Sequence, residues 1–231
     1  MAGKKRADED KTVPGGAATT RVLIVDDHEV VREGLRLLIN AAAGLHVCGE
    51  AANASEARLA VEQLCPDVAI VDLSLGNGSG LDLVRWIKTN HPAVRSIVAS
   101  MHEENLYGLR ALRAGAWGYV GKSQPARTIL NAIRQVLIGE LYFGKELVDS
   151  TMRRAADPAA PQTSAIELLS DRELEVFRHI GQGLTSKEIA QNLNLSASTV
   201  DTYRERLKAK LGISHSTQLA YQATRWALEN P

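Results

Sequence analysis

The chain of 231 residues has few cysteines, no excess charge and no long apolar run. Two cysteines, Cys48 and Cys65, do not make a disulfide framework, so we interpret both as small buried hydrophobic residues in a reducing compartment. No apolar run reaches the ~18 residues that span a bilayer, and the N-terminus lacks the apolar core of an export signal. We therefore expect a cytoplasmic protein. The 27 basic and 27 acidic residues cancel, so the net charge argues neither for nor against a nucleic-acid partner.

The composition and the periodicity predict two domains after a polar N-terminal tail. Apolar residues make up 45% of the chain, enough for packed cores. Residues 1–20 contain almost no large apolar side chains and predict a flexible tail. Residues 21–145 alternate helical patterns with short apolar runs at 21–25, 46–50, 67–71, 95–99 and 117–120. This alternation predicts an α/β domain with a five-stranded parallel sheet and helices on both faces.

Polar side chains follow the apolar runs at the point where each strand should end. Asp26 and Asp27 follow the first run, Asp72 the third and Ser100 the fourth. Lys122 lies just beyond the fifth. Because ligands bind at the carboxyl ends of the strands in open α/β sheets, we expect these groups to share one edge. A single carboxylate there would be interpreted as a solvated turn residue, but the whole set favours a functional site.

Carboxylates that share an edge repel one another unless a cation lies between them. Mg²⁺ prefers such oxygen ligands. Together with Lys122 it could neutralise an incoming phosphoryl group, while one carboxylate attacks phosphorus and Ser100 donates to the new phosphate oxygens. The pattern therefore predicts phosphoryl chemistry with Mg²⁺ as cofactor.

These residues, in this order and at this spacing, resemble a response-regulator receiver domain of flavodoxin-like (βα)5 fold. The resemblance implies Asp72 as the phosphoacceptor and a Mg²⁺ site in which Asp27, Asp72 and the Ser74 carbonyl are ligands and Asp26 acts through water. It further implies that Ser100 and Tyr119 form the pair that moves on phosphorylation, although a core aromatic explains Tyr119 almost as well. One departure is Leu75-Gly76, where the family usually has Met-Pro. We expect the glycine-rich loop 76–80 to be more mobile for that reason and to alter the phosphoryl lifetime.

The rest of the chain predicts a linker over residues 146–165 and a small all-α domain over residues 166–231. The linker contains two prolines and no apolar period. Capping boxes start helices at Ser170 and Thr185, a third helix starts near Ser196 and ends at Gly212, and a fourth starts at Ser214. The second and third helices form a predicted helix-turn-helix within four helices.

This C-terminal domain is similar to the LuxR/NarL-type helix-turn-helix output domain, over residues 169–176, 183–190, 195–200 and 210–213. The resemblance implies that the third helix enters the major groove of double-stranded DNA, and palindromic sites imply a homodimer. The residues at positions expected to face DNA come from both helices of the motif: Thr185, Ser186, Lys187, Ser198, Thr199, Asp201, Thr202, Arg204, Glu205, Arg206 and Lys208.

The charges of this domain complicate the DNA prediction. Residues 164–231 contain eight Lys/Arg and eight Asp/Glu, so the domain is not basic overall. The third helix concentrates cations at Arg204, Arg206, Lys208 and Lys210, which suit phosphate contacts. Asp201 and Glu205 stand where many relatives have lysine. They would repel phosphates but can accept a hydrogen bond from cytosine N4.

We expect a two-component response regulator, not an enzyme. A sensor histidine kinase would phosphorylate Asp72, and phosphorylation would favour a DNA-competent dimer and so control transcription. Two alternatives stay open. One is a receiver-containing interaction protein with weak or no DNA binding, motivated by Asp201 and Glu205. The other is a Mg²⁺-dependent phosphohydrolase with Asp72 as nucleophile, which leaves the C-terminal domain unexplained.

Overall fold

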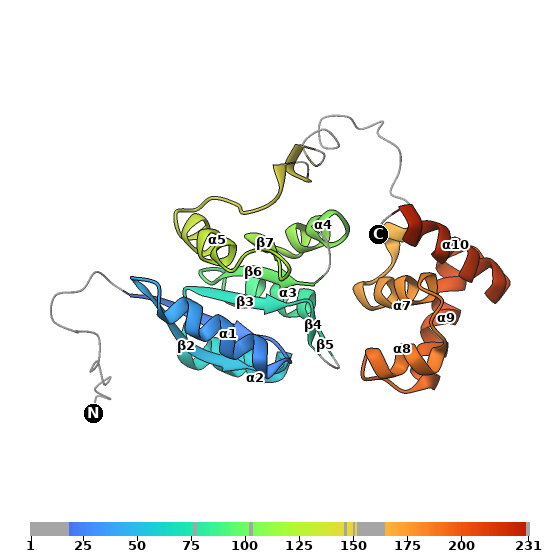
Figure 1. The fold of residues 1–231 in the computed structure, drawn as a ribbon, viewed down its shortest axis with the longest axis horizontal. Coiled ribbons are helices and arrows are strands. Elements are labelled where there is room, and N and C mark those ends of the chain that lie inside the picture. The colour runs from blue at the N-terminus through green and yellow to red at the C-terminus, as the bar shows by residue number, and fades with distance from the viewer. Residues whose placement is uncertain are drawn as a thin grey trace, which may run out of the picture.

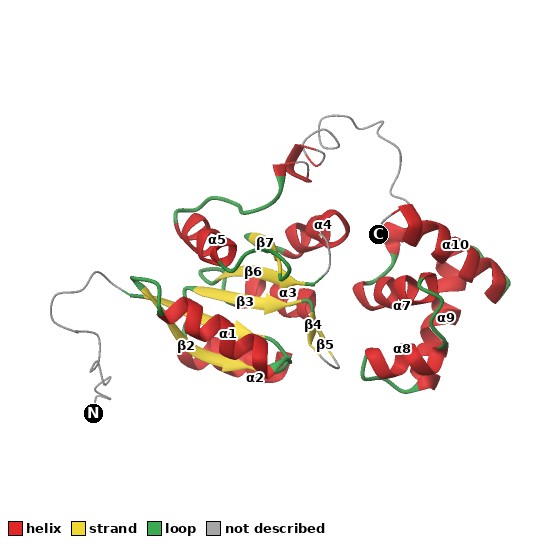
Figure 2. Ribbon diagram, viewed as in Figure 1, coloured by secondary structure: helices red, strands yellow, loops and turns green. Residues whose placement is uncertain are grey.

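The computed structural model describes residues 19–75, 78–101, 104–145, 147–149, 151 and 165–229. A sheet flanked by helices comes first, and a purely helical unit follows it (Figures 1 and 2). The expected tail over residues 1–20 and the expected linker over residues 146–165 lie largely outside the described residues. No helix within the described ranges is long and apolar enough to cross a membrane.

The expected five-stranded parallel sheet is present, with small shifts at the strand ends. Its strands are β1 (Thr20–Val25), β2 (Leu45–Ala51), β3 (Val68–Asp72), β6 (Arg95–Ser100) and β7 (Gly118–Gly121). They lie in the order β2-β1-β3-β6-β7, and every pairing is parallel. The chain reverses its direction of winding between β1 and β3, which is where an open α/β sheet forms its ligand crevice.

Both faces of the sheet are covered by helices, which explains why its strands are continuous apolar runs. One face packs on α1 (Glu29–Asn40) and α5 (Arg127–Leu137) through alternate strand residues such as Ile24 and Ile70. The opposite face, with Val25 and Val71, packs on three further helices. These helices are α2 (Ala54–Leu64), α3 (Gly80–Asn90) and α4 (Glu104–Ala114).

The helix starts in the C-terminal unit follow the predicted caps. Both capping boxes form, at Ser170 for α7 (Asp171–Gly181) and at Thr185 for α8 (Ser186–Asn192). The Ser196 side chain caps α9 (Ala197–Leu211), and Gly212 ends that helix with φ 66°. A short 3₁₀ helix, η1 (Ala165–Leu168), precedes α7, and α10 (Ser216–Glu229) follows α9. The predicted four-helix domain with its helix-turn-helix is therefore confirmed.

The first and last helices of this domain, α7 and α10, pack closely against each other. A Cβ at Gly181 would lie 2.5 Å from the Ala223 carbonyl oxygen, so only glycine allows this approach. The Phe177 and Trp226 rings lie 5.7 Å apart and are inclined at 55°. Aromatic pairs at such distances stabilise a core beyond the area that they bury.

Two expectations are corrected. Cys65 is exposed and Cys48 is only partly buried, so the interpretation of both as buried hydrophobic residues is wrong. Cys65 caps α2 in the left-handed region, at φ 43°, which places it at the turn into β3. The glycine-rich segment after Asp72 contains a short antiparallel ladder of β4 (Ser74–Leu75) and β5 (Gly78–Ser79) instead of only a loop. Residues 76–77 lie outside the described residues, and the expected mobility of the segment stays a prediction.

Candidate functional site

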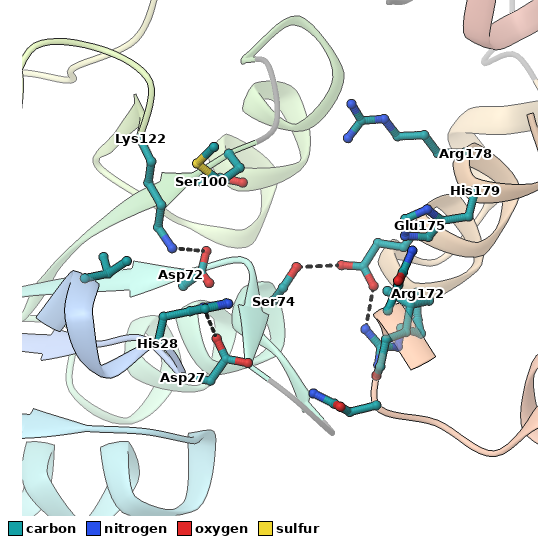
Figure 3. A pocket seen from close by; sticks show the side chains of 15 residues that line it. Asp27, His28, Asp72, Ser74, Ser100, Lys122, Arg172, Glu175, Arg178 and His179 are labelled. Carbon is teal, nitrogen blue, oxygen red and sulfur yellow. Dashed lines mark hydrogen bonds and ion pairs between the residues drawn. The ribbon is translucent and has the colours of Figure 1, made fainter. Parts of the chain in front are cut away.

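Four strand ends bring the expected polar residues to one edge of the sheet, as the sequence predicts. Asp26 and Asp27 follow β1, Asp72 is the last residue of β3, and Ser100 is the last of β6. Lys122 follows β7 and reaches back toward Asp72 (Figure 3). Asp26, Asp72 and Ser100 are all buried. The crevice therefore holds buried carboxylates and a buried hydroxyl around one lysine.

The lysine ammonium lies between two carboxylates. Lys122 Nζ lies 2.6 Å from Asp26 Oδ2 and 3.0 Å from Asp72 Oδ1. The Lys122 backbone N–H also donates to the Ser100 carbonyl oxygen at 2.6 Å, which ties the turn after β7 to the end of β6. Ion pairs in a poorly hydrated site hold their geometry better than exposed pairs do. Lys122 is thus held between the Asp26 and Asp72 carboxylates.

His28 belongs to this cluster, although it was not among the expected residues. Its Nδ1 lies 2.8 Å from Asp27 Oδ1 and 3.3 Å from Asp26 Oδ1, and its backbone N–H donates to Asp26 Oδ1. The side chain is 68% exposed and stands at the start of α1. Its position directly after Asp26-Asp27 was the one available signal.

Burial sets the acidity of Asp72. Removal from water raises the pKa of this carboxyl from 3.8 to about 6, and the Asp26 charge acts in the same direction. Lys122 opposes both effects. With a pKa near 6 the group is mostly ionised at neutral pH, because each unit is a factor of ten. Asp72 is therefore a buried carboxylate that is still available as a nucleophile.

The oxygen atoms at this edge fit a hard divalent cation. One ligand atom from each of Asp26, Asp27, His28 and Asp72 lies within 4.8 Å of all the others. Mg²⁺ takes such carboxylates and retains several waters. The acidic cluster is consistent with a metal site, as the sequence analysis expected.

Ser100 and Tyr119 form a second, fully buried pair beside this cluster. Ser100 is 1% exposed and Tyr119 is 2% exposed. Burial raises the pKa of the Tyr119 phenol, and its hydrogen bond with Ser100 acts in the opposite direction. Tyr119 also belongs to the apolar cluster that α3 and α4 cover, so the core and hydrogen-bonding interpretations both apply.

The crevice opens into a cavity of about 530 Å³ that helix α7 bounds on its other side. Arg172, Glu175, Arg178 and His179 of α7 line the cavity together with Asp72. The Ser74 hydroxyl donates to Glu175 Oε1 at 3.2 Å across the cavity (Figure 3). No local sequence signal indicated this contact, because its partners come from different domains.

The expected DNA-contact residues follow the surface of α8 and α9. Lys187, Ser198, Thr202 and Arg206 are exposed, whereas Val200 is buried in the core of the domain. The remaining polar positions of the set are exposed or partly buried: Thr185, Ser186, Thr199, Asp201, Arg204, Glu205 and Lys208. None of the eleven expected DNA-contact residues is buried.

The two acidic residues and two lysines of α9 have partners inside the domain. Ser186 Oγ donates to Asp201 Oδ1 at 2.8 Å, and Lys208 Nζ lies 2.8 Å from Glu205 Oε1. Lys210 Nζ lies 2.7 Å from Glu173 Oε2, which is buried at the start of α7. Lys210, expected to suit phosphate contacts, is therefore engaged within the domain.

Comparison with known proteins agrees with this geometry. Residues 22–134 match the response regulator receiver domain, and residues 167–223 match the luxR family of bacterial regulatory proteins. "Response regulator UvrY" of Escherichia coli (strain K12) is 34% identical over 90% of this chain and 95% of its own. "DNA-binding transcriptional activator DevR/DosR" of Mycobacterium tuberculosis is 35% identical over 91% and 97%.

A solved structure extends the likeness across both units. RcsB from Salmonella enterica serovar Typhimurium, bound to a promoter in the presence of the phosphomimetic BeF3−, has a TM-score of 0.58 and 25% identity. The match covers 90% of this chain and 99% of that one.

The fold and the crevice define a receiver joined to a DNA-binding output domain. The chain belongs to the two-component response regulators with a LuxR-type helix-turn-helix, the NarL/FixJ type. DevR/DosR is a transcriptional activator by name and the luxR family accounts for the C-terminal domain, so the phosphohydrolase alternative is set aside.

Proposed function

We propose that a sensor histidine kinase phosphorylates Asp72 and that this modification controls DNA binding by α9. One observation carries the proposal: the Lys122 ammonium lies 3.0 Å from the Asp72 carboxylate at the edge where the sheet forms its crevice. Asp72 is only 5% exposed, which protects an acyl phosphate from water.

The proposed transfer uses the ionised carboxylate. An Asp72 oxygen attacks phosphorus in line with the leaving group, so a new P–O bond forms while the P–N bond of the donor phosphohistidine breaks. The leaving imidazole keeps the electron pair and takes a proton. Lys122, freed from one carboxylate oxygen, neutralises charge on the transferred group.

A Mg²⁺ ion fits this proposal as the cofactor. Asp26, Asp27 and Asp72 would hold it, and the resemblance adds the Ser74 carbonyl as a further ligand. When bound, the ion supplies positive charge that offsets the repulsion between the carboxylates and the incoming phosphoryl group. The residues themselves orient the nucleophile and exclude water.

Ser100 and Tyr119 are the proposed switch. Ser100 lies at the end of β6 beside Lys122 and donates to phosphate oxygens in the proposed phosphorylated state. Its shift would change the buried hydrogen bond with Tyr119 and the packing beneath α4. The added charge would shift the balance between two states, in which the contact between the receiver and α7 is either formed or broken.

The DNA-contact residues are those of α8 and α9 described above. Arg204 and Arg206 would contact phosphates, while Asp201 and Glu205 would accept from cytosine N4 instead of repeating the lysine contacts of other family members. A homodimer would place two such helices on a palindromic site. A regulator of this kind acts on chromosomal DNA and hence in the cytoplasm.

The test combines intact mass with DNA selection. Acetyl phosphate and Mg²⁺ should add one phosphoryl group to the wild type and none to Asp72→Asn. The phosphorylated protein is then used to select sites from a random double-stranded library. Enrichment that depends on phosphorylation supports the proposal, and equal enrichment with Asp72→Asn refutes the switch.

A second candidate is a phosphorylated interaction protein with weak or no DNA binding. The contacts Ser186–Asp201 and Lys208–Glu205 favour it, because they place carboxylates on the surface of α9 and use one cation internally. Absence of any mobility shift at low salt, with phosphorylated protein and the unselected random library, would support this candidate. A specific complex whose affinity falls with salt would eliminate it.

A further inference from the structure

The cavity in front of Asp72 is shared by the two domains. Its volume of about 530 Å³ lies within the ~300–1,000 Å³ of small-molecule sites. Asp72, Ser100 and Lys122 line the receiver side, and Arg172, Glu175 and Arg178 line the α7 side. Figure 1 shows α7 facing β4 and β5 beyond the end of β3. Access to Asp72 therefore depends on where α7 lies.

A polar clamp holds α7 in this place. We define the Asp171 clamp as Asp171 with its partners Ser79, Arg85 and Arg110. Arg110 Nη1 lies 3.2 Å from Asp171 Oδ1, and Arg85 Nη2 lies 3.4 Å from Asp171 Oδ2. Ser79 Oγ donates to Asp171 Oδ2 at 3.5 Å.

Arg110 also fixes the segment that leads into α7. Its Nη1 donates to the Leu169 carbonyl oxygen at 2.5 Å, and its Nη2 donates to the Ile166 carbonyl oxygen at 3.0 Å. The side chain is 14% exposed, so this guanidinium is largely withdrawn from water. One arginine of α4 thus binds the first residue of α7 and two backbone carbonyls of the segment before it.

Phosphodonors of different size need different amounts of space in front of Asp72. A small acyl phosphate needs only the cavity. A protein donor must bring a histidine ring into line with Asp72 while its own surface rests on the rim, and specific protein contacts cover ~600 Å² or more on each partner. Part of that rim is occupied by α7 while Glu175 is held by Ser74.

We propose that α7 filters phosphodonors: with the Asp171 clamp closed, Asp72 accepts a phosphoryl group from small acyl phosphates and not from a phosphohistidine protein. The inference rests on Asp72 as the phosphoacceptor. In both reactions an Asp72 oxygen bonds to phosphorus. The P–O bond of the acyl phosphate or the P–N bond of phosphohistidine breaks, and the leaving carboxylate or imidazole keeps the electron pair. Kinase-driven phosphorylation therefore requires the clamp to open first.

A reversible lock tests this filter in the full chain. Ser79→Cys and Asp171→Cys are introduced together, with Cys48→Ser and Cys65→Ser, since Ser79 Oγ and Asp171 Oδ2 are 3.5 Å apart. The oxidised and reduced forms receive acetyl phosphate or an autophosphorylated sensor kinase that transfers to the reduced form. Oxidation should slow transfer from the kinase about tenfold or more and leave acetyl phosphate labelling within about twofold.

A second variant tests the same idea by opening the clamp. Arg110→Ala should speed kinase transfer and leave acetyl phosphate labelling unchanged. Arg134→Ala, an exposed arginine on α5, is the matched control. Equal kinase rates in the oxidised and reduced lock, or in Arg110→Ala and Arg134→Ala, overturn the filter. Loss of both donors on oxidation also overturns it, whereas labelling of the reduced form that persists after Asp72→Asn refutes Asp72 as phosphoacceptor.

Discussion

Replacing Asp72 with asparagine should stabilise the metal-free protein at neutral and alkaline pH. Burial raises the pKa of the carboxyl from 3.8 to about 6, with Asp26 adding to the shift and Lys122 opposing it. The folded state therefore binds this proton more tightly than the unfolded state does. A difference of about 2 units corresponds to about 3 kcal/mol, at ~1.4 kcal/mol for each unit.

The pH window follows from the direction of that shift. Below about pH 4 the Asp72 carboxyl is protonated in both states, so it adds no pH dependence. As the pH rises from about 4 to about 7, ionisation of Asp72 costs the wild type up to ~3 kcal/mol, and the variant has no proton to lose. The variant keeps Lys122 paired, because Asp26 Oδ2 lies 2.6 Å from its Nζ.

Urea unfolding with a chelator, followed by tryptophan fluorescence near pH 4 and about pH 8, measures this difference. Between pH 4 and pH 8, we expect the free energy of unfolding of Asp72→Asn to rise by about 2–3 kcal/mol relative to that of the wild type. Asp82→Asn is the control, since it replaces a carboxylate that is 67% exposed and lies outside the crevice. Added Mg²⁺ should favour the wild type, because the ion binds its folded state. A gain that does not grow with pH would refute the burial argument.

Three further predictions concern single side chains. Lys122→Ala should slow labelling by acetyl phosphate roughly 10²-fold with the fold retained by circular dichroism, because the positive charge beside Asp72 is lost. Gly80→Ala should destabilise the receiver by about 3 kcal/mol or more in urea unfolding, since its Cβ would lie 1.9 Å from the Asp72 carbonyl oxygen. Gly34→Ala, where a Cβ meets nothing within 4 Å, is its control and should stabilise α1 by about 0.5–1 kcal/mol. Asp201→Lys should strengthen nonspecific DNA binding and steepen its salt dependence by about one phosphate contact, measured by fluorescence anisotropy.

The crevice was predictable because a parallel sheet places all its carboxyl ends together. Asp72 and Lys122 are far apart in the chain, yet each follows an apolar run, and strand order alone then brings them to one edge. His28 was missed because its role depends on how its ring turns back toward Asp27 at the start of α1. The β4–β5 ladder was missed because its glycines favour a loop as strongly as a short hairpin.

The contact between the domains could not be predicted in the same way. Ser74 and Glu175 are 101 positions apart, and neither belongs to a pattern that names the other. Asp171 has a sufficient local explanation as an acidic residue in the first turn of α7. Its second role, with Arg110, becomes visible only once α4 and α7 are placed in space.

DNA binding should change the rate of phosphorylation, because residues of the Asp171 clamp and of α9 line the same cavity. Tyr203 and Arg206 of α9 line a cavity of about 410 Å³ with Arg110 and Asp171. DNA that engages α9 therefore competes with the closed arrangement and lowers the cost of opening it. Linkage is reciprocal, so DNA that binds the open form more tightly must favour that form by the same factor by which opening favours DNA binding, typically ~5–150-fold. A selected site should then raise the rate of transfer from the kinase and leave labelling by acetyl phosphate unchanged. A scrambled duplex at equal concentration is the control, and an equal rise for both donors would place the effect on the chemistry of Asp72 and not on the position of α7.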